Sequence, residues 1–237
     1  MTKLNIAILS YRSAPFGGGQ GVYIHDISKA LSIMGHKVDV ISGPPYPNLS
    51  EEVNLIQLPG LDLFQTFSFK ERIKIFWKKE KKNFSDIYEF ISVLFGGFPE
   101  MRTFGYRARD YLILNKHYDI VIDNQSISYA MIDIQKLFPF IEIIHHPITK
   151  DFKYEMEQSN KLLYKFSRYR WYSFLKMQKK VAPKISNIIT VSINSLKDIS
   201  KDFNCDPSRI TVIQNGLDID IFRPYKEILR NPLRLIT

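Results

Sequence analysis

A glycine cluster directly after the first apolar segment is the feature that most constrains the fold of this chain. The apolar run Leu4–Leu9 leads to Gly17-Gly18-Gly19-Gln20-Gly21, and an amphipathic segment begins at Tyr23. This order predicts a strand, a tight turn and a helix. Glycines let the backbone approach a ligand closely, and a helix N-terminus directs free N–H groups at an anion. The cluster therefore predicts either a purely structural turn or a site for a phosphate-bearing ligand.

The cluster matches neither of the two common nucleotide-binding patterns. The dinucleotide pattern G-x-G-x-x-G fails because Val22 and Ile24 stand where its last glycine would be, and the P-loop pattern G-x-x-x-x-G-K-[ST] is absent. A dinucleotide enzyme also needs an acidic residue at the end of its second strand, where this chain has Ser42-Gly43-Pro44-Pro45. We therefore expect neither NAD nor a P-loop nucleotide as a cofactor.

Strand-like and helix-like segments alternate along the chain. The predicted strands are short and apolar, and they are Leu4–Leu9, Lys37–Ser42, Val53–Leu58, Tyr118–Asp123, Ile141–His145, Asn187–Val191 and Ile210–Gln214. The predicted helical segments are Tyr23–Met34, Lys70–Lys116, Ser126–Leu137, Asp151–Val181 and Ser195–Phe203, the last opened by a capping box at Ser195-Leu196-Lys197-Asp198. Because parallel neighbours require crossover helices, this alternation predicts an α/β fold with a doubly wound parallel sheet.

Length and cysteine content indicate a folded protein of a reducing compartment. The chain has 237 residues, of which 45% are hydrophobic, enough for one or two domains with a sizeable core. Its single cysteine, Cys205, allows no internal disulfide. No apolar run approaches the roughly 20 residues that cross a bilayer, and the N-terminus does not resemble a signal peptide. We therefore expect a cytoplasmic protein.

The net charge of +9 is concentrated in two stretches. Lys70–Lys82 carries seven basic residues against two glutamates, and Lys161–Lys184 carries eight basic residues and no acidic one. Aromatic residues are interleaved with the charges in both, a composition that suits an anionic membrane surface. A solvated helix face with inward aromatics is the alternative. No nucleic-acid partner is expected, because no recognised nucleic-acid motif accompanies the charge.

Five segments stand in an order that resembles a known family. They are the glycine loop, Gly35-His36-Lys37-Val38, Ile143-Ile144-His145-His146-Pro147, Ile189–Ser195 and Asn215–Pro224. This order resembles the N-terminal, acceptor-side domain of family-4, GT-B-fold, retaining glycosyltransferases. The segments Ile41–Pro47, Gly96–Glu100 and His145–Thr149 resemble one bacterial subgroup of that family. The resemblance implies a Rossmann-like domain over residues 1–224. It also implies that residues 225–237 are a linker and the truncated first strand, Leu233–Thr237, of a missing C-terminal donor-binding domain.

The resemblance also implies an activity. Such enzymes have two Rossmann-like domains that face each other across a cleft, the first binding mostly the acceptor and the second the nucleotide-sugar donor. The glycine loop, Gly17–Gly21, would reach the donor's diphosphate and sugar, and N–H groups directed there would stabilise the leaving diphosphate. No metal and no resident cofactor is expected, since the nucleotide-diphosphate sugar is a substrate. The acceptor would be a glycan or lipid-linked, at the inner face of the membrane. Without the donor domain, this chain alone should be inactive.

The resemblance places the catalytic histidine of the family at His145, where it would hydrogen-bond the donor sugar beside the reacting carbon. The alternative for His145 is a structural cap of the strand end. His146 is a candidate acceptor-binding residue, with the same structural alternative. Because neighbouring strand residues point to opposite faces, the two histidines are not expected to serve equally. Asp123, Asn124 and Gln125 end another strand at the same edge and are candidates for binding acceptor hydroxyls, with a turn or N-cap as the alternative.

Other polar motifs have simpler interpretations. Ser192 and Ser195 are interpreted as helix caps, and Asn215-Gly216 as a turn before the hinge. Asp218-Ile219-Asp220 is similar to a metal-binding D-x-D motif, but its place in the interdomain segment argues against a metal. Two adjacent histidines likewise lack the spacing of a metal site.

Two other functions compete with the glycosyltransferase interpretation. One is a stand-alone, non-catalytic module that binds a glycan or a partner chain. The other is half of a GT-B-fold sugar-nucleotide epimerase, which lacks the hinge segment Asn215–Pro224. The DNA downstream of codon 237 separates the first rival from a full enzyme, because a full enzyme requires an open frame that encodes the donor domain.

Overall fold

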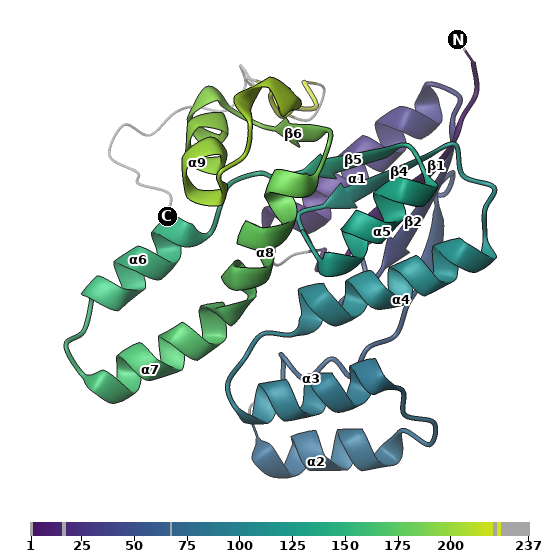
Figure 1. Ribbon diagram of the computed structural model, residues 1–237. Helices are drawn as coiled ribbons and strands as arrows, with labels where there is room; N and C mark the ends of the chain where they lie inside the picture. Colours follow the sequence, from purple (N-terminus) through teal and green to yellow (C-terminus); the bar gives the residue numbers. More distant parts are fainter. Residues whose placement is uncertain (1, 16–17, 67, 220–221, 224–237) are drawn as a thin grey trace, which may run out of the picture.

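The computed structural model describes residues 2–15, 18–66, 68–219 and 222–223. One parallel sheet of seven strands, in the order β3-β2-β1-β4-β5-β6-β7, forms its centre (Figure 1). The strands are β1 (Asn5–Ser10), β2 (Lys37–Ser42), β3 (Asn54–Gln57), β4 (Ile120–Asn124), β5 (Phe140–Ile143), β6 (Ile188–Thr190) and β7 (Ile210–Val212). The predicted doubly wound parallel sheet is confirmed. Its winding direction changes between β1 and β4, which is the topological switch point.

Helices cover both faces of the sheet. They are α1 (Gly19–Ile33), α2 (Phe69–Lys78), α3 (Phe84–Leu94), α4 (Glu100–Leu114), α5 (Tyr129–Leu137), α6 (Thr149–Glu157), α7 (Leu162–Trp171), α8 (Leu175–Val181) and α9 (Ile193–Phe203). Short 3₁₀ turns lie at Tyr172–Phe174, Ala182–Lys184 and Pro207–Arg209. Helix α1 packs on one face, and α4, α5, α8 and α9 contribute to the core on the other.

Strand β1 shows why the central strands are nearly continuous apolar runs. Its side chains alternate between the two faces, so Ile6 and Ile8 join the core that contains Ile24 of α1, whereas Ala7 and Leu9 join the core on the opposite face. All four are at most 3% exposed, as expected for a parallel sheet covered by helices on both sides. This double burial leaves the carboxyl edge of the sheet as the place where polar side chains gather.

The two long predicted helical regions are helical, and breaks divide each of them into separate helices. Region 70–116 forms α2, α3 and α4. Asn83 starts α3 with a capping box that involves Asp86, and Gly96, at φ 75, follows its C-cap. Region 151–181 forms α6, α7 and α8, with a break between Glu157 and Leu162. At the two ends of α3, Asn83 and Gly96 satisfy backbone groups and do not continue the helix.

Three further expectations on local structure were wrong. The capping box does not open α9 at Ser195, because Ser192 is its N-cap and its Oγ accepts the Ser195 N–H at 3.0 Å. Helix α1 begins at Gly19, four residues before the predicted Tyr23, so the glycine cluster extends into its first turn. Asn215-Gly216 lies in irregular chain after β7, and the turn comes later, at Ile219.

Two helical pairs extend beyond the sheet. The α2–α3 pair is inserted between β3 and α4, and the α6–α7 pair between β5 and α8 (Figure 1). Within the described ranges, no helix has both the length and the apolar character that crossing a membrane demands. The predicted linker and strand over residues 225–237, including Leu233–Thr237, lie outside the described residues.

Candidate active site

Polar residues from three strands meet at the carboxyl edge of the sheet. The turn that leads into α1 follows β1, Asn124 ends β4, and His145 lies two residues beyond the end of β5. Strands β1 and β4 are neighbours that flank the topological switch point, where open α/β sheets bind their ligands. The candidate site is therefore the region between the start of α1 and the ends of β4 and β5.

The first turn of α1 provides backbone donors. Gly18 is the N-cap, with φ 98, and Gly19, Gln20 and Gly21 begin the helix, whereas Gly17 lies outside the described residues. No side chain caps this helix, and its first turn carries no acidic residue. The N–H groups of the turn are therefore available to an anion, and the helix dipole is not offset by a carboxylate.

Two glycines of the turn differ in what a side chain would meet at their positions. A Cβ at Gly21 would lie 2.2 Å from the backbone oxygen of Ala14, so Gly21 permits the close approach of α1 to the loop after β1. A Cβ at Gly19 would have nothing within 4 Å. Packing alone thus explains why position 21 requires glycine, whereas packing does not explain the glycine at position 19.

Three groups hold His145. Its Nε2 lies 2.9 Å from Asn124 Oδ1, and its backbone N–H donates to Gln125 Oε1 at 2.9 Å. Its ring meets Tyr23 edge-to-face, with centroids 4.6 Å apart. Because Tyr23 lies one helical turn after Gly19, this contact places the imidazole beside the start of α1. The structure thus brings together the predicted catalytic histidine and the described part of the glycine turn.

Burial keeps the imidazole of His145 neutral. It lowers the pKa of His145 from 6.5 to about 4, with a smaller contribution from the charge of neighbouring His146. Since Nε2 donates to the Asn124 amide oxygen, Nδ1 is an acceptor. The site therefore offers a neutral hydrogen-bonding group and not a fixed positive charge.

Gln125 links the ends of β4 and β5. Its φ of 61 lies in the left-handed region, and its amide both accepts from His145 N–H and donates to the His146 carbonyl oxygen at 3.2 Å. Asn124 and Gln125 are 0% and 3% exposed. Both side chains thus orient the histidine segment, and their predicted contact with acceptor hydroxyls stays a prediction.

Asp123 closes the turn after β4. Its carboxylate accepts from the N–H and hydroxyl of Ser126 and from the N–H of Ile127 at 3.2 Å. The residue is completely buried. These bonds correspond to the turn that was the alternative interpretation of Asp123, while its role in acceptor binding stays a prediction.

Glu142 is a buried partner of Asp123 that sequence reasoning missed. The two residues pair in register on β4 and β5, and both are 0% exposed. Burial, followed by the charge of Asp123, raises the pKa of Glu142 well above its usual value and favours its protonated form beside Asp123. The available signal was an acidic residue in the middle of an otherwise apolar strand.

His146 occupies a different environment from His145. Its side chain is 61% exposed, and its Nε2 lies 3.9 Å from Asp151. The structure therefore separates the two adjacent histidines, one packed against α1 and one facing solvent. The predicted contact of His146 with an acceptor is compatible with this exposure and stays a prediction.

Glu100 is a second acidic residue that sequence reasoning did not single out. It begins α4 beside the ends of β1 and β2, and it lies 3.7 Å from Arg12. Burial raises its pKa to about 8, although Arg12 opposes this shift. The Glu100 carboxyl group is thus largely protonated at neutral pH. The sequence signal that could have identified Glu100 was its position directly after Pro99, at the start of a helix.

The two motifs that resemble metal sites, Asp218-Ile219-Asp220 and the adjacent histidines, were not expected to bind a metal. Asp218 of the D-x-D-like motif is exposed, whereas Asp220 lies outside the described residues. Across the described ranges, no three histidine, cysteine or acidic residues are grouped closely enough to hold a metal ion.

Comparison with known proteins gives one family and several related structures. The model of Glycosyltransferase Family 4 matches residues 17–221. The MMP alpha-(1->4)-mannosyltransferase of Mycolicibacterium hassiacum is 38% identical over 231 residues, which are 96% of this chain and 55% of that protein. The chain therefore spans about half the length of this curated relative.

Two solved structures share the fold at low sequence identity. WaaG, a glycosyltransferase involved in lipopolysaccharide biosynthesis, aligns with a TM-score of 0.55 and 15% identity over 91% of this chain and 46% of that chain. The catalytic domain of starch synthase IV from Arabidopsis thaliana aligns with a TM-score of 0.52 and 14% identity over 92% of this chain and 53% of that chain.

The two glycines allow a matched test of the turn. We expect Gly21→Ala to lower the free energy of unfolding by about 1–3 kcal/mol, because its Cβ would collide with Ala14 O. Gly19→Ala should cause no loss, since its Cβ meets open space and alanine favours a helix. Urea unfolding of the two variants measures the difference. Equal destabilisation by both would contradict this division of roles.

Proposed function

The chain belongs to Glycosyltransferase Family 4, and on that premise we propose that it is the acceptor-side half of a retaining, metal-independent enzyme that uses a nucleotide-diphosphate sugar. The family expected from the sequence motifs is confirmed, as is the Rossmann-like fold of GT-B glycosyltransferases. One observation carries the proposal: the uncapped first turn of α1 and the neutral His145 lie side by side at the switch point of the sheet.

The backbone of the glycine turn would bind the donor's diphosphate. Its N–H groups and helix dipole favour an anion, and in this reaction negative charge grows on the diphosphate as it leaves. His145 would act next to it, with Nδ1 accepting a hydrogen bond from a hydroxyl of the donor sugar. A neutral imidazole suits this task, because it orients the sugar without adding a positive charge beside the reacting carbon.

The second wall of the site would come from a donor-binding domain. The relative in M. hassiacum is about twice as long as the matched region and is named as a mannosyltransferase. We infer that the full-length protein transfers a hexose, with nucleotide-diphosphate mannose as the first donor to test, to a glycan or lipid-linked acceptor. The 237-residue chain should show little or no turnover by itself.

Membership of Glycosyltransferase Family 4 favours a transferase over the alternative of half a sugar-nucleotide epimerase. The stand-alone binding module is the competing outcome in the activity test, because such a module would bind a saccharide or partner chain without releasing nucleotide diphosphate.

The proposed role of His145 is tested in the full-length protein. We expect His145→Ala to reduce kcat/KM for transfer about 100-fold, comparable to loss of one hydrogen bond made in the transition state. Release of nucleotide diphosphate from the sugar donor measures this. His117→Ala, at the opposite end of β4, is the matched control. Unchanged turnover in His145→Ala would exclude the proposed site, and no turnover in the unaltered protein would favour the binding module.

A further part of the proposal concerns an anionic membrane surface. Helices α2 and α7 contain no buried residue. Trp77 on α2 is 71% exposed, and Leu162 and Leu163 on α7 are 83% and 85% exposed, beside the lysines and arginines of the two basic stretches. Exposed apolar groups among cations support contact with anionic lipid. In the second stretch this applies only to α7, because Leu175, Met177 and Val181 of α8 are buried.

Membrane contact is tested with Trp77 as the only tryptophan, in a Trp171→Phe background. Vesicles that contain phosphatidylserine should shift the Trp77 emission to shorter wavelength, and the shift should weaken with salt because exposed charges are screened. Lys78→Glu should weaken binding more than Lys116→Glu, a matched charge reversal outside the basic stretches. No shift, or one indifferent to salt, would assign the two stretches to a solvated helix face.

A further inference from the structure

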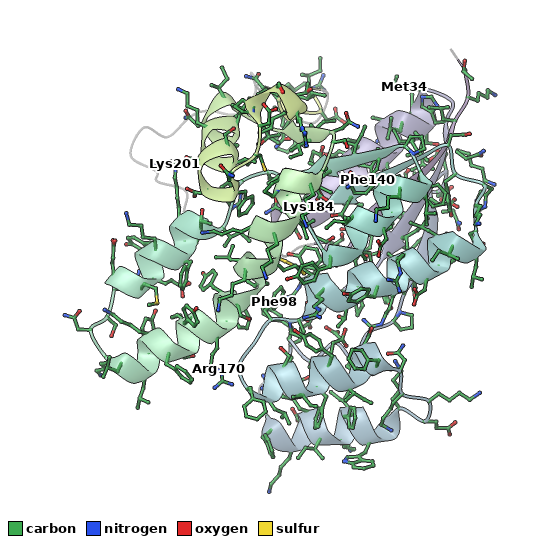
Figure 2. All side chains as sticks on the ribbon, viewed as in Figure 1. Met34, Phe98, Phe140, Arg170, Lys184 and Lys201 are labelled. Carbon is green, nitrogen blue, oxygen red and sulfur yellow. The ribbon has the colours of Figure 1, made fainter. Side chains whose placement is uncertain are left out.

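A cavity lies between the two projecting helical pairs. Its volume is about 280 Å³, near the lower end of the range of roughly 300–1,000 Å³ that is typical for small-molecule sites. We name it the aromatic pocket, and define it by Phe64, Phe98, Trp171, Arg72, Arg168 and Glu100. These residues come from four separate parts of the chain: the β3–α2 connection, α2, the α3–α4 turn with the start of α4, and α7. Figure 2 places Phe98 between the α3–α4 region and the α7–α8 arm.

Three aromatic rings form one wall of the aromatic pocket. The ring centroids of Phe64 and Phe98 are 5.5 Å apart, those of Phe98 and Trp171 5.1 Å, and those of Phe64 and Trp171 5.5 Å. Each ring thus contacts the other two, which fixes their orientation. Rigid aromatic surfaces with polar groups beside them suit a ligand that has both apolar and polar faces, as a sugar ring does.

Two guanidinium groups add positive charge. Arg72 donates through Nε to the carbonyl oxygen of Thr66, and within the described ranges its terminal nitrogens have no carboxylate partner. Arg168 pairs with Glu155 at 3.3 Å, while its Nε is buried without a partner. Guanidinium groups match the planar geometry of phosphate and carboxylate oxygens. The ligand that fits the aromatic pocket therefore carries negative charge.

Glu100 connects the aromatic pocket with the carboxyl edge of the sheet. It lines the pocket and also lies 3.7 Å from Arg12, which comes two residues after β1. Arg12 in turn lies over the ring of Phe64, 3.7 Å from its centroid. At neutral pH the Glu100 carboxyl is largely protonated, because burial raises its pKa to about 8. It can thus donate a hydrogen bond to a sugar oxygen and does not repel an anion.

We propose that the aromatic pocket binds the accepting saccharide, and that this saccharide bears a phosphate or carboxylate group held by Arg72 and Arg168. The sugar ring stacks on Trp171 and Phe98, and Glu100 faces the candidate active site. The identification of this saccharide as the acceptor rests on the proposed function. The binding of an anionic sugar rests on the geometry of the aromatic pocket alone.

The test uses Trp171 as the reporter, in the 237-residue chain with Trp77→Phe, which removes the other tryptophan at a side chain that is 71% exposed. Mannose 6-phosphate, glucose 6-phosphate, glucuronate, mannose and inorganic phosphate are titrated separately while Trp171 emission is recorded. We expect at least one anionic sugar to change the emission and to bind about tenfold more tightly than mannose, because a charge-assisted hydrogen bond contributes about that factor. Inorganic phosphate should bind weakly and leave the emission unchanged.

Matched variants separate the cations from general charge. Arg72→Gln should weaken binding of the anionic sugar about tenfold and leave mannose binding unchanged. Lys116→Gln removes one positive charge outside the aromatic pocket and should have no effect. Phe98→Leu should weaken binding of charged and uncharged sugars alike, since it removes part of the stacking wall.

The inference is overturned by no response to any of the sugars, by equal affinity in Arg72→Gln and the unaltered chain, or by an equal response to inorganic phosphate. An equal Trp171 response to phosphatidylserine vesicles without sugar would assign the cations to a lipid headgroup, and would overturn it too. These titrations use no donor and no second domain. A failure of sugar transfer in the full-length protein together with an intact Trp171 response would therefore refute the proposed function and leave the aromatic pocket as an anionic-saccharide site.

Discussion

The close approach of α1 to the loop after β1 is the constraint on which the candidate site depends. It is possible because Gly21 lacks a Cβ where the Ala14 carbonyl oxygen stands. With α1 held there, its uncapped first turn lies at the carboxyl edge of the sheet, and Tyr23 covers the His145 imidazole. Loss of that approach would move the backbone donors and the histidine together. A single packing contact thus couples the uncapped turn to the histidine.

A second set of buried groups holds the opposite side of the site. Glu142 pairs with Asp123 in the sheet register, and Asp123 closes the turn that places Gln125 in the left-handed region. Gln125 then fixes the backbone on both sides of His145. All three residues are buried, so the histidine is oriented by a network that does not itself face solvent. The aromatic pocket lies beyond this network, between helices that are inserted into the basic α/β fold.

The sequence predicted the fold well and the site in part. Alternating apolar runs were sufficient for the parallel sheet, because burial on both faces requires them, and the order of motifs was sufficient for the family. The helix start at Asn83 was missed, since its local capping box competes with a continuous helical pattern. Glu142 and Trp171 were not identified as a buried acid and a pocket wall. Both roles depend on contacts between segments distant in sequence, which periodicity does not reveal.

The central claim is that the first turn of α1 and His145 form one wall of a site for a nucleotide-diphosphate sugar. The most direct measurement is an NMR titration of the full-length protein with nucleotide-diphosphate mannose, which records the backbone amides of Gly18 and Gly19 and the imidazole of His145. The account predicts that all three sets of resonances shift with one saturation curve, while the imidazole stays neutral at pH values well above its pKa of about 4. Donor binding that shifts neither the glycine amides nor the His145 ring would contradict it.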